Sequence, residues 1–181
     1  MIRPADTRDA AEIAEIYRPF CEESCVSFET EAPDAPEISA RIERISRRFP
    51  WLVSEIGGAV AGYAYASPHR ERAAYRWAVE VTVYVHSGFQ GQGVGRSLYE
   101  RLFGHLRDQG FFKAYAGILV PNPASQAFHE AMGFALVGIY KKVGYKLGAW
   151  RDVGWWELAL QPETDSPAEP RPPLLISTSH L

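Results

Sequence analysis

The sequence lacks the features that mark a membrane, secreted or nucleic-acid-binding protein. No apolar run approaches the roughly 18 residues that span a bilayer, and residues 1–17 turn polar and acidic at once, unlike a signal peptide. The 19 basic and 22 acidic residues give a formal net charge of −3, without the basic character that duplex binding usually needs. We therefore expect a soluble, cytoplasmic protein with no membrane or nucleic-acid partner.

Cysteine is scarce as well. Cys21 and Cys25 are the only two cysteines. Their spacing is not CxxC, and no second pair of ligands lies near them in the sequence. Because free cysteines are among the most buried residue types, we expect two reduced, buried thiols and no metal site.

What is present is an ordinary globular composition. The chain has 181 residues, of which 46% are hydrophobic and 23% charged, enough for one core without disulfides or a metal. Residues 1–160 are expected to form a single domain. Residues 161–181 are proline-rich and lack periodicity, which predicts an extended or disordered tail. This tail could still lie along the domain through Leu174, Leu175 and Ile176.

Apolar periodicity and capping residues predict the elements. Asp6 or Thr7 caps a helix that Pro19 kinks or ends, and Asp34 with Glu37 predicts a capping box before a second helix. Two later helices end at glycines, and strands are predicted over residues 1–3, 51–56, 59–67, 79–86, 112–119, 135–140 and 154–160. This order of elements predicts an α+β fold with a mixed sheet.

The strand over 79–86 has two different faces. Its valines alternate with Glu80, Thr82 and Tyr84, so one face is apolar and the other presents an acid, a hydroxyl and a phenol. The sequence therefore predicts a buried strand that also carries reactive groups.

A glycine-rich segment, Gln90 to Arg96 (QGQGVGR), follows this strand and opens a helix. Such a turn presents free backbone N–H groups and the positive end of a helix dipole, which suit a phosphate or pyrophosphate. The spacing fits neither a Walker loop nor a dinucleotide fingerprint. The alternative is a glycine turn without a ligand, although three alternating glycines are costly in backbone entropy.

The combined motifs resemble those of a known superfamily. The pattern Gln90-x-x-Gly93-x-Gly95 after a V-x-V strand, with Asn122 and the segment AFHEAMGF, resembles the GNAT superfamily of N-acetyltransferases. The segments FPWLVSE (49–55), AYASP (64–68), AYRWAVEVTVYV (74–85) and GYKLGAWRDVGWW (144–156) are similar to those of the phosphinothricin and methionine sulfoximine acetyltransferases.

This resemblance covers residues 1–160 and implies both a fold and a ligand. The fold would be the GNAT fold, a mixed, mostly antiparallel central sheet that is splayed at an acetyl-CoA cleft and flanked by helices. By similarity, the backbone of the cleft strand would pair with the pantetheine arm, the turn amides would hold the pyrophosphate, and Asn122 would reach the pantetheine. The residues implied in cofactor binding are Val83, Tyr84, Val85, Gly91, Gln92, Gly93, Val94, Gly95, Arg96 and Asn122.

The resemblance also implies two catalytic residues. Glu80 matches the acidic residue of the family and would be the general base, directly or through a water, if burial raises its pKa; otherwise it would be a surface glutamate in a salt bridge. His129 stands where many members of the superfamily have a tyrosine acid. Its role as base, acid or positioning group stays open, and Tyr140 is a weaker candidate acid.

The acceptor implied is a primary amine on a small amino-acid-like molecule. Arg72 and Tyr75 are the expected clamp for its carboxylate or phosphinate, with Arg70 in reserve. Phe28 matches an aromatic near the substrate. Val153 matches a segment that lines the pocket from a partner subunit, which implies a homodimer.

One departure concerns His69. It stands where close phosphinothricin enzymes have a bulky aromatic residue, which leaves the identity of the acceptor open. The reaction expected is direct attack in a ternary complex, because no cysteine lies in the cleft motifs. The alternatives are a protein or peptide N-terminal acetyltransferase, and a non-catalytic acyl-CoA-binding sensor that would lack the base.

Overall fold

A computed structural model describes residues 1–173. Seven strands form one sheet in the order β1-β2-β3-β4-β5-β7-β6. Only β4 and β5 pair in parallel, and the other neighbours are antiparallel. The strands are β1 (Ile2–Pro4), β2 (Trp51–Ile56), β3 (Ala59–Pro68), β4 (Ala78–Val85), β5 (Lys113–Val120), β6 (Ala135–Lys146) and β7 (Ala149–Ala159). The expected mixed, mostly antiparallel sheet is confirmed.

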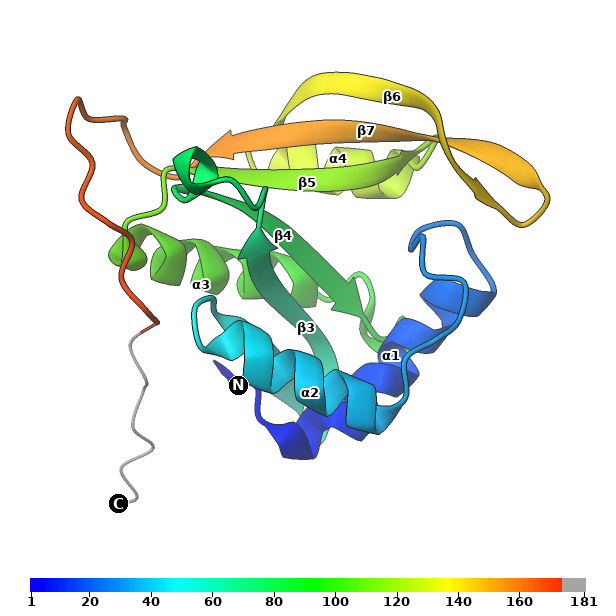
Figure 1. Ribbon diagram of the computed structural model, residues 1–181. Coiled ribbons are helices and arrows are strands. Elements are labelled where there is room, and N and C mark those ends of the chain that lie inside the picture. The colour runs from blue at the N-terminus through cyan, green and yellow to red at the C-terminus, as the bar shows by residue number, and fades with distance from the viewer. Residues whose placement is uncertain (174–181) are drawn as a thin grey trace, which may run out of the picture.

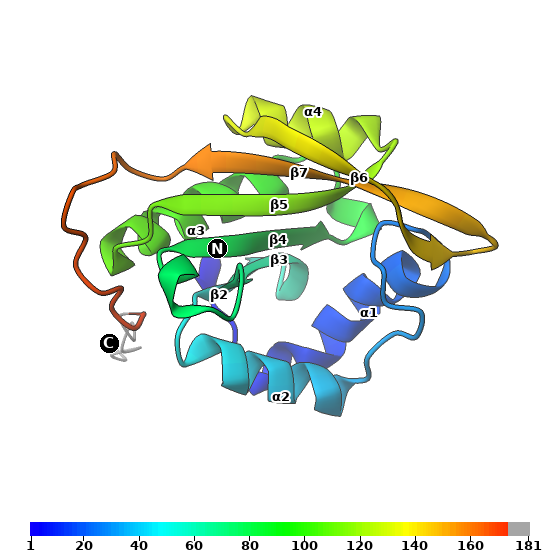
Figure 2. The ribbon, with the colours of Figure 1, turned by 45° about the horizontal axis from the view of Figure 1, so that its top comes forward.

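Four α-helices flank this sheet (Figures 1 and 2). They are α1 (Ala10–Glu22), α2 (Ala35–Ser46), α3 (Val94–Gln109) and α4 (Pro123–Ala131), and short 3-10 turns cover Thr7–Asp9, Ala73–Tyr75 and Ser87–Phe89. Alternation along the strands divides the core, because successive side chains point to opposite faces. On β2, Val53 packs with α1 and α2, whereas Leu52 packs in the cluster that contains α3.

Side-chain caps mark the start of α2 and of the 3-10 turn that precedes α1. The Asp34 side chain accepts a hydrogen bond from the Glu37 N–H at 2.9 Å, which satisfies one of the free donors of the first turn. Only this half of the expected capping box is present, because the Glu37 carboxylate accepts from Arg41 Nε at 2.8 Å instead. Asp6 makes a capping box with Asp9 at the Thr7–Asp9 turn, directly ahead of α1.

Pro19 was expected to kink or end α1, but it does not end the helix. The helix continues to Glu22. A proline this close to the C-terminal end removes a single intrahelical donor, and the Pro19 carbonyl still accepts from Glu23 N–H at 3.0 Å.

The β6–β7 hairpin is longer than predicted. Its strands run to Lys146 and start again at Ala149, with an irregularity in the register between Tyr140 and Gly144. The Asp152 carboxylate accepts from the Lys142 backbone N–H at 2.8 Å and from Lys141 Nζ at 2.9 Å. Because these contacts join residues of two strands, the alternation of apolar residues along β6 did not reveal them.

Residues 161–173 follow the surface of the domain without forming a helix or strand. Trp77 Nε1 donates to the Ala168 carbonyl at 2.8 Å, and the Arg171 N–H donates to the Gln109 carbonyl at 2.8 Å. The expected contacts of Leu174, Leu175 and Ile176 lie outside the described residues, and the division at residue 160 stays a prediction. None of the helices within residues 1–173 has the length and hydropathy to cross a bilayer.

Gly62 gives a test of how tightly β3 and β4 pack. A Cβ on Gly62 would lie 2.8 Å from the backbone oxygen of Tyr84, and the pairing of Gly62 with Val85 leaves neither strand free to move away. We expect Gly62→Ala to lower the free energy of unfolding by about 1–3 kcal/mol. Gly104→Ala, in α3 with no atom within 4 Å of the added Cβ, should raise it by about 0.5–1 kcal/mol. Urea denaturation of both variants measures these changes. An unchanged free energy of unfolding in Gly62→Ala would contradict the tight packing of β3 on β4.

Candidate active site

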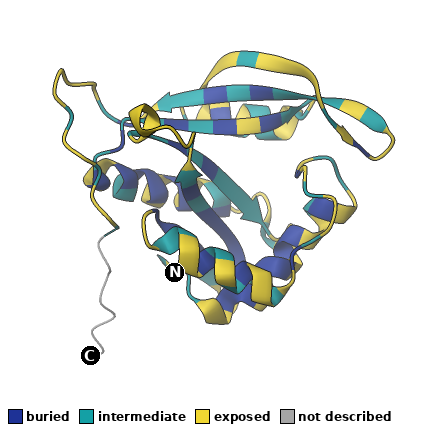
Figure 3. Ribbon diagram, in the orientation of Figure 1, coloured by how far each residue is buried: buried dark blue, intermediate teal, exposed yellow. Residues whose placement is uncertain are grey.

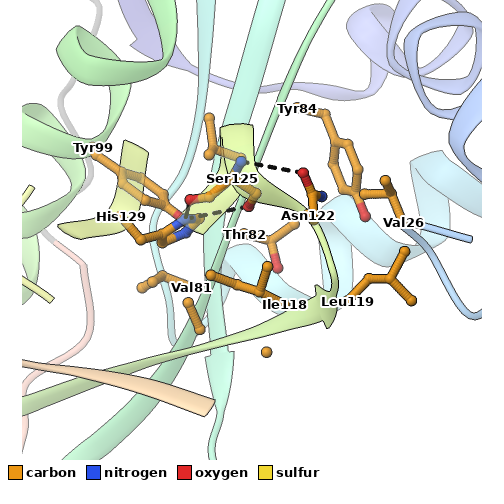
Figure 4. A pocket seen from close by; sticks show the side chains of 13 residues that line it. Val26, Val81, Thr82, Tyr84, Tyr99, Ile118, Leu119, Asn122, Ser125 and His129 are labelled. Carbon is orange, nitrogen blue, oxygen red and sulfur yellow. Dashed lines mark hydrogen bonds between the residues drawn. The ribbon is translucent and has the colours of Figure 1, made fainter. Parts of the chain in front are cut away.

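The sheet opens between β4 and β5. These strands pair only from Ala78 with Lys113 to Glu80 with Tyr115, and within the described residues the β5-facing edge of β4 has no strand partner beyond Glu80. A cavity of about 90 Å³ occupies the opening, lined by Val81 to Tyr84 of β4 and by residues 116–119 of β5 (Figure 4). The backbone groups along this edge are therefore available to an extended ligand.

A larger cleft adjoins the opening. Its volume is about 540 Å³, and its walls come from β4, the glycine turn and α4. The two cavities share Tyr84, Asn122 and His129. The residues predicted to bind the cofactor that line this cleft are Val83, Tyr84, Val85, Gly91, Gly93, Val94, Gly95, Arg96 and Asn122.

The glycine turn uses backbone conformations that favour glycine. Gly91 and Gly93 have φ values of +74° and +79°, in the left-handed region that glycine adopts at low cost. Gly93 is the N-cap of α3, a helix of 16 residues, so the N–H groups of the first turn face the cleft and suit an anionic group. Gln92 differs from the other turn residues, because its Nε2 donates back to the Gly88 carbonyl at 3.1 Å.

Asn122 lies at the start of α4 and at the edge of the cleft. Its Oδ1 accepts from the Ser125 N–H at 3.2 Å and so caps α4. The same side chain borders both cavities, and Figure 4 shows it at the smaller one. One residue therefore anchors α4 and presents an amide to the cleft.

His129 is 6% exposed and is held at both ring nitrogens. Nδ1 lies 2.8 Å from the Ser125 carbonyl, which only accepts, so Nδ1 carries the proton. Nε2 lies 3.2 Å from the hydroxyl of Tyr99 and accepts from it. Burial lowers the pKa of His129, so the imidazole is neutral at neutral pH.

Glu80 lies at the point where the strands separate. Its Oε1 is 3.2 Å from Nδ1 of His69 and 3.0 Å from a guanidinium nitrogen of Arg70. Burial raises the pKa of Glu80, and the positive charge of Arg70 opposes that rise. Glu80 therefore makes a salt bridge, as expected for a surface glutamate. Its side chain, however, is only 31% exposed.

The structure does not bring Glu80 and His129 into contact. The Glu80 side chain shares its face of β4 with Tyr84, whose ring packs against Tyr17 and Phe20 of α1. His129 packs against Tyr99 of α3 on the other side of the sheet. Any ligand that reaches both residues has to pass through the opening between β4 and β5.

The residues predicted to bind the acceptor are dispersed. Arg72 is exposed ahead of the 3-10 turn Ala73–Tyr75, and the Tyr75 ring lies 6.0 Å from that of His69. Phe28 packs on Gly144 of β6, and Val153 of β7 pairs with Leu119. Arg70, the reserve candidate, is the arginine that contacts Glu80.

Two residues that no sequence pattern indicated support the site, Tyr99 in the wall of the smaller cavity and Lys146 behind it. Tyr99 is fully buried and orders His129. Lys146 is 5% exposed, and its Nζ donates to the carbonyls of Ser27 at 2.6 Å and Glu29 at 2.7 Å. Lys146 thereby ties the α1–α2 loop to the β6–β7 hairpin. Its position between two glycines in GYKLG was the one available signal.

Comparison with known proteins agrees with this geometry. The family model of the acetyltransferase (GNAT) domain matches residues 2–155. Phosphinothricin N-acetyltransferase of Streptomyces viridochromogenes is 43% identical over 171 residues, 94% of this chain and 91% of that protein. The L-methionine sulfoximine/L-methionine sulfone acetyltransferase of Salmonella typhimurium is 37% identical over 160 residues, 88% of this chain and 94% of that protein.

A solved structure extends the likeness to three dimensions. The GNAT superfamily phosphinothricin acetyltransferase from Sinorhizobium meliloti, in complex with AcCoA, superposes with a TM-score of 0.88 at 35% sequence identity, covering 93% of each chain. The fold expected from the resemblance is thus confirmed. This chain belongs to the GNAT family of acetyltransferases.

Proposed function

We propose that this protein is an acetyl-CoA-dependent N-acetyltransferase that acts on the primary amine of a small amino-acid-like molecule, such as phosphinothricin, methionine sulfoximine or a related amino acid. The observation that carries this proposal is the opening of β4 from β5 directly beside Glu80. This opening places the Glu80 carboxylate next to a cleft that is lined in part by the glycine turn.

The groups that line the cleft support acetyl-CoA as its ligand. Its β4 edge offers unpaired backbone groups to the amides of a pantetheine arm. The amides of Gly91 to Arg96 suit the pyrophosphate, with Arg96 as an exposed cation at the same end of α3. Bound there, acetyl-CoA supplies the activated acetyl group.

Glu80 provides the proton acceptor in this proposal. An amine is mostly protonated at neutral pH, and its ammonium proton passes to the Glu80 carboxylate, directly or through a water. The freed nitrogen then attacks the thioester carbonyl carbon, so that the C–N bond forms and the C–S bond breaks, and the second proton lost by the nitrogen passes through solvent to the departing thiolate. Neither Cys21 nor Cys25 lines the two cavities of the described residues, which favours direct transfer over an acyl-enzyme.

His129 is assigned a positioning role. Its Nε2 lone pair is engaged by Tyr99, and its Nδ1 proton by Ser125, so neither nitrogen is free to exchange protons with substrate. The imidazole instead orients the Tyr99 phenol at the wall of the opening, where both residues line the smaller cavity (Figure 4).

The acceptor clamp is proposed at the Glu80 end of the opening. Arg72 and Tyr75 are exposed, the Tyr75 ring lies 6.0 Å from that of His69, and a guanidinium grips a carboxylate or phosphinate in a bidentate manner. A protein N-terminal acetyltransferase would need an open groove here. A non-catalytic acyl-CoA sensor would not need a partly buried carboxylate whose pKa is raised.

A homodimer is part of the proposal. The edge strand β6 and its hairpin are largely exposed (Figure 3), and they carry a row of exposed apolar side chains. These are Leu136, Val137, Ile139, Tyr140, Val143, Tyr145, Leu147 and Trp150, each at least 37% exposed. Apolar patches on this scale mark interaction surfaces, and a second copy would also cover the open edge of the sheet. A cytoplasmic location agrees with the two free cysteines.

An acceptor panel and Glu80→Gln together test the function. The purified protein, acetyl-CoA and a set of free amino acids, phosphinothricin and methionine sulfoximine should give acceptor-dependent thiol release. Glu80→Gln should reduce kcat/KM by about 10²–10⁴-fold, the usual contribution of a general base. Because burial raises the pKa of Glu80, wild-type kcat/KM should fall as the pH drops through that pKa, and the variant should lose this dependence. Full turnover by Glu80→Gln would refute the base assignment.

Gly93→Ala tests the glycine turn. A side chain at a φ of +79° strains the turn by about 1 kcal/mol or more, which should weaken acetyl-CoA binding by about tenfold in calorimetry. Gly148→Ala is the matched control, because Gly148 also has a positive φ of +74° but lies in the turn between β6 and β7. Equal effects of the two variants would argue against a cofactor role for Gly93.

Val137→Asp tests the dimer. Val137 is 59% exposed in the monomer, and an aspartate buried in an apolar interface costs several kcal/mol, so the dissociation constant should rise more than about tenfold. Light scattering after size exclusion measures the mass. Ile56→Asp, on the 40% exposed Ile56 at the end of β2, should leave the dimer intact. A wild-type monomer at high concentration would contradict the proposal.

A further inference from the structure

His69 makes a contact with Glu80 that the sequence did not predict. It lies immediately after β3, and its side chain is 13% exposed. Its Nδ1 is 3.2 Å from Oε1 of Glu80. Because an ionised carboxylate only accepts hydrogen bonds, Nδ1 carries a proton and donates it toward Oε1.

Aromatic neighbours hold the imidazole ring in place. It stacks on Tyr115 of β5, with 4.3 Å between ring centroids and 17° between ring planes. The rings of Trp155 and Tyr75 meet it edge-on at 5.9 and 6.0 Å. Tyr115 is also the β5 partner of Glu80 in the sheet, so the stack fixes the imidazole beside the last paired residues of β4 and β5.

We propose that His69 is a positioning residue for the acetyl transfer, whose Nδ1–H keeps the Glu80 carboxylate ionised and directed at the point where β4 and β5 separate. This inference rests on the proposed role of Glu80 as proton acceptor. A phenylalanine at this position would supply the stacking but no donor, so the hydrogen bond depends on the imidazole N–H.

The surrounding charges support this arrangement. Burial raises the pKa of Glu80, so the carboxylate needs donors to remain charged. Arg70 is the only cation within ion-pair distance of it among residues 1–173, and its side chain is 42% exposed and also lies over Trp155. Tyr65 and Tyr115 are neutral at working pH, since burial raises the pKa of both phenols. Burial, followed by the Arg70 charge, lowers the pKa of His69, so its imidazole is neutral at neutral pH and serves as a donor through Nδ1.

The two functions of the imidazole can be separated by substitution. His69→Phe retains an aromatic ring but removes the donor, and His69→Asn retains a donor near the Nδ1 position but removes the stack. A charge-assisted hydrogen bond favours the ionised form of its acceptor, so its loss moves the acidic limb of the kcat/KM profile to higher pH. We expect His69→Phe to be about tenfold slower than wild type on the acidic side and nearly equal to it on the alkaline side.

His69→Asn should keep the wild-type acidic limb. His105→Phe, which changes a half-buried histidine of α3 away from the two cavities, is the control and should leave the whole profile unchanged. A loss in His69→Phe that is the same at every pH, or an identical loss in His69→Asn, would overturn the proposal. Calorimetry with acetyl-CoA verifies that each variant is folded.

Two measurements separate this inference from the function on which it rests. If Glu80→Gln retains full turnover, the base assignment fails and the role of His69 fails with it. If Glu80→Gln is inactive and His69→Phe keeps the wild-type limb, only the role of His69 fails. Nitrogen NMR of the wild-type imidazoles gives a readout that needs no variant: His69 should show a protonated Nδ1 at neutral pH, and an Nε2–H tautomer would contradict the proposal.

Discussion

The separation of β4 from β5 after Glu80 is the constraint on which the rest of the site depends. Parallel pairing over three residues on each strand holds the two halves of the sheet together, and beyond it the backbone groups of β4 need other partners. The polar residues of the site lie along this opening. Glu80 is the last paired residue, Tyr84 and Asn122 border the opening, and the glycine turn lies at the end of the cleft that continues from it.

Burial near this opening changes how the polar groups behave. Glu80 and His69 lie beside a guanidinium that both lowers the pKa of His69 and limits the rise in the pKa of Glu80. His129 is neutral for a different reason, because it is almost fully enclosed by α3 and α4 and both of its ring nitrogens are paired. The two histidines therefore have neutral imidazoles that act on opposite sides of the sheet.

The outer wall of the site is held by a buried cation. Lys146 is surrounded by backbone carbonyls of the α1–α2 loop, which compensate for the loss of water around its charge. The loop so anchored contributes Val26 to both cavities and places Phe28 on Gly144. Substitution of Phe28 would thus affect the hairpin as well as any acceptor, because the two segments are in direct contact.

Local patterns in the sequence determined the order of strands and helices, the alternating faces of β4, and the glycine turn before α3. These features depend on periodicity and on backbone preferences within a few residues. The family motifs added the cleft and the acidic residue at its end. Only the tertiary structure decided that Arg70 and not Arg72 pairs with Glu80, that His69 shares that carboxylate, that Lys146 ties the loop to the hairpin, and that β6 and β7 extend to the hairpin tip. Lys146 and the Ser27 carbonyl are 119 positions apart, and the two contacts of Glu80 depend on which way an irregular loop turns after β3. No sequence period encodes either kind of contact, because each depends on side chains that meet only after the sheet has formed.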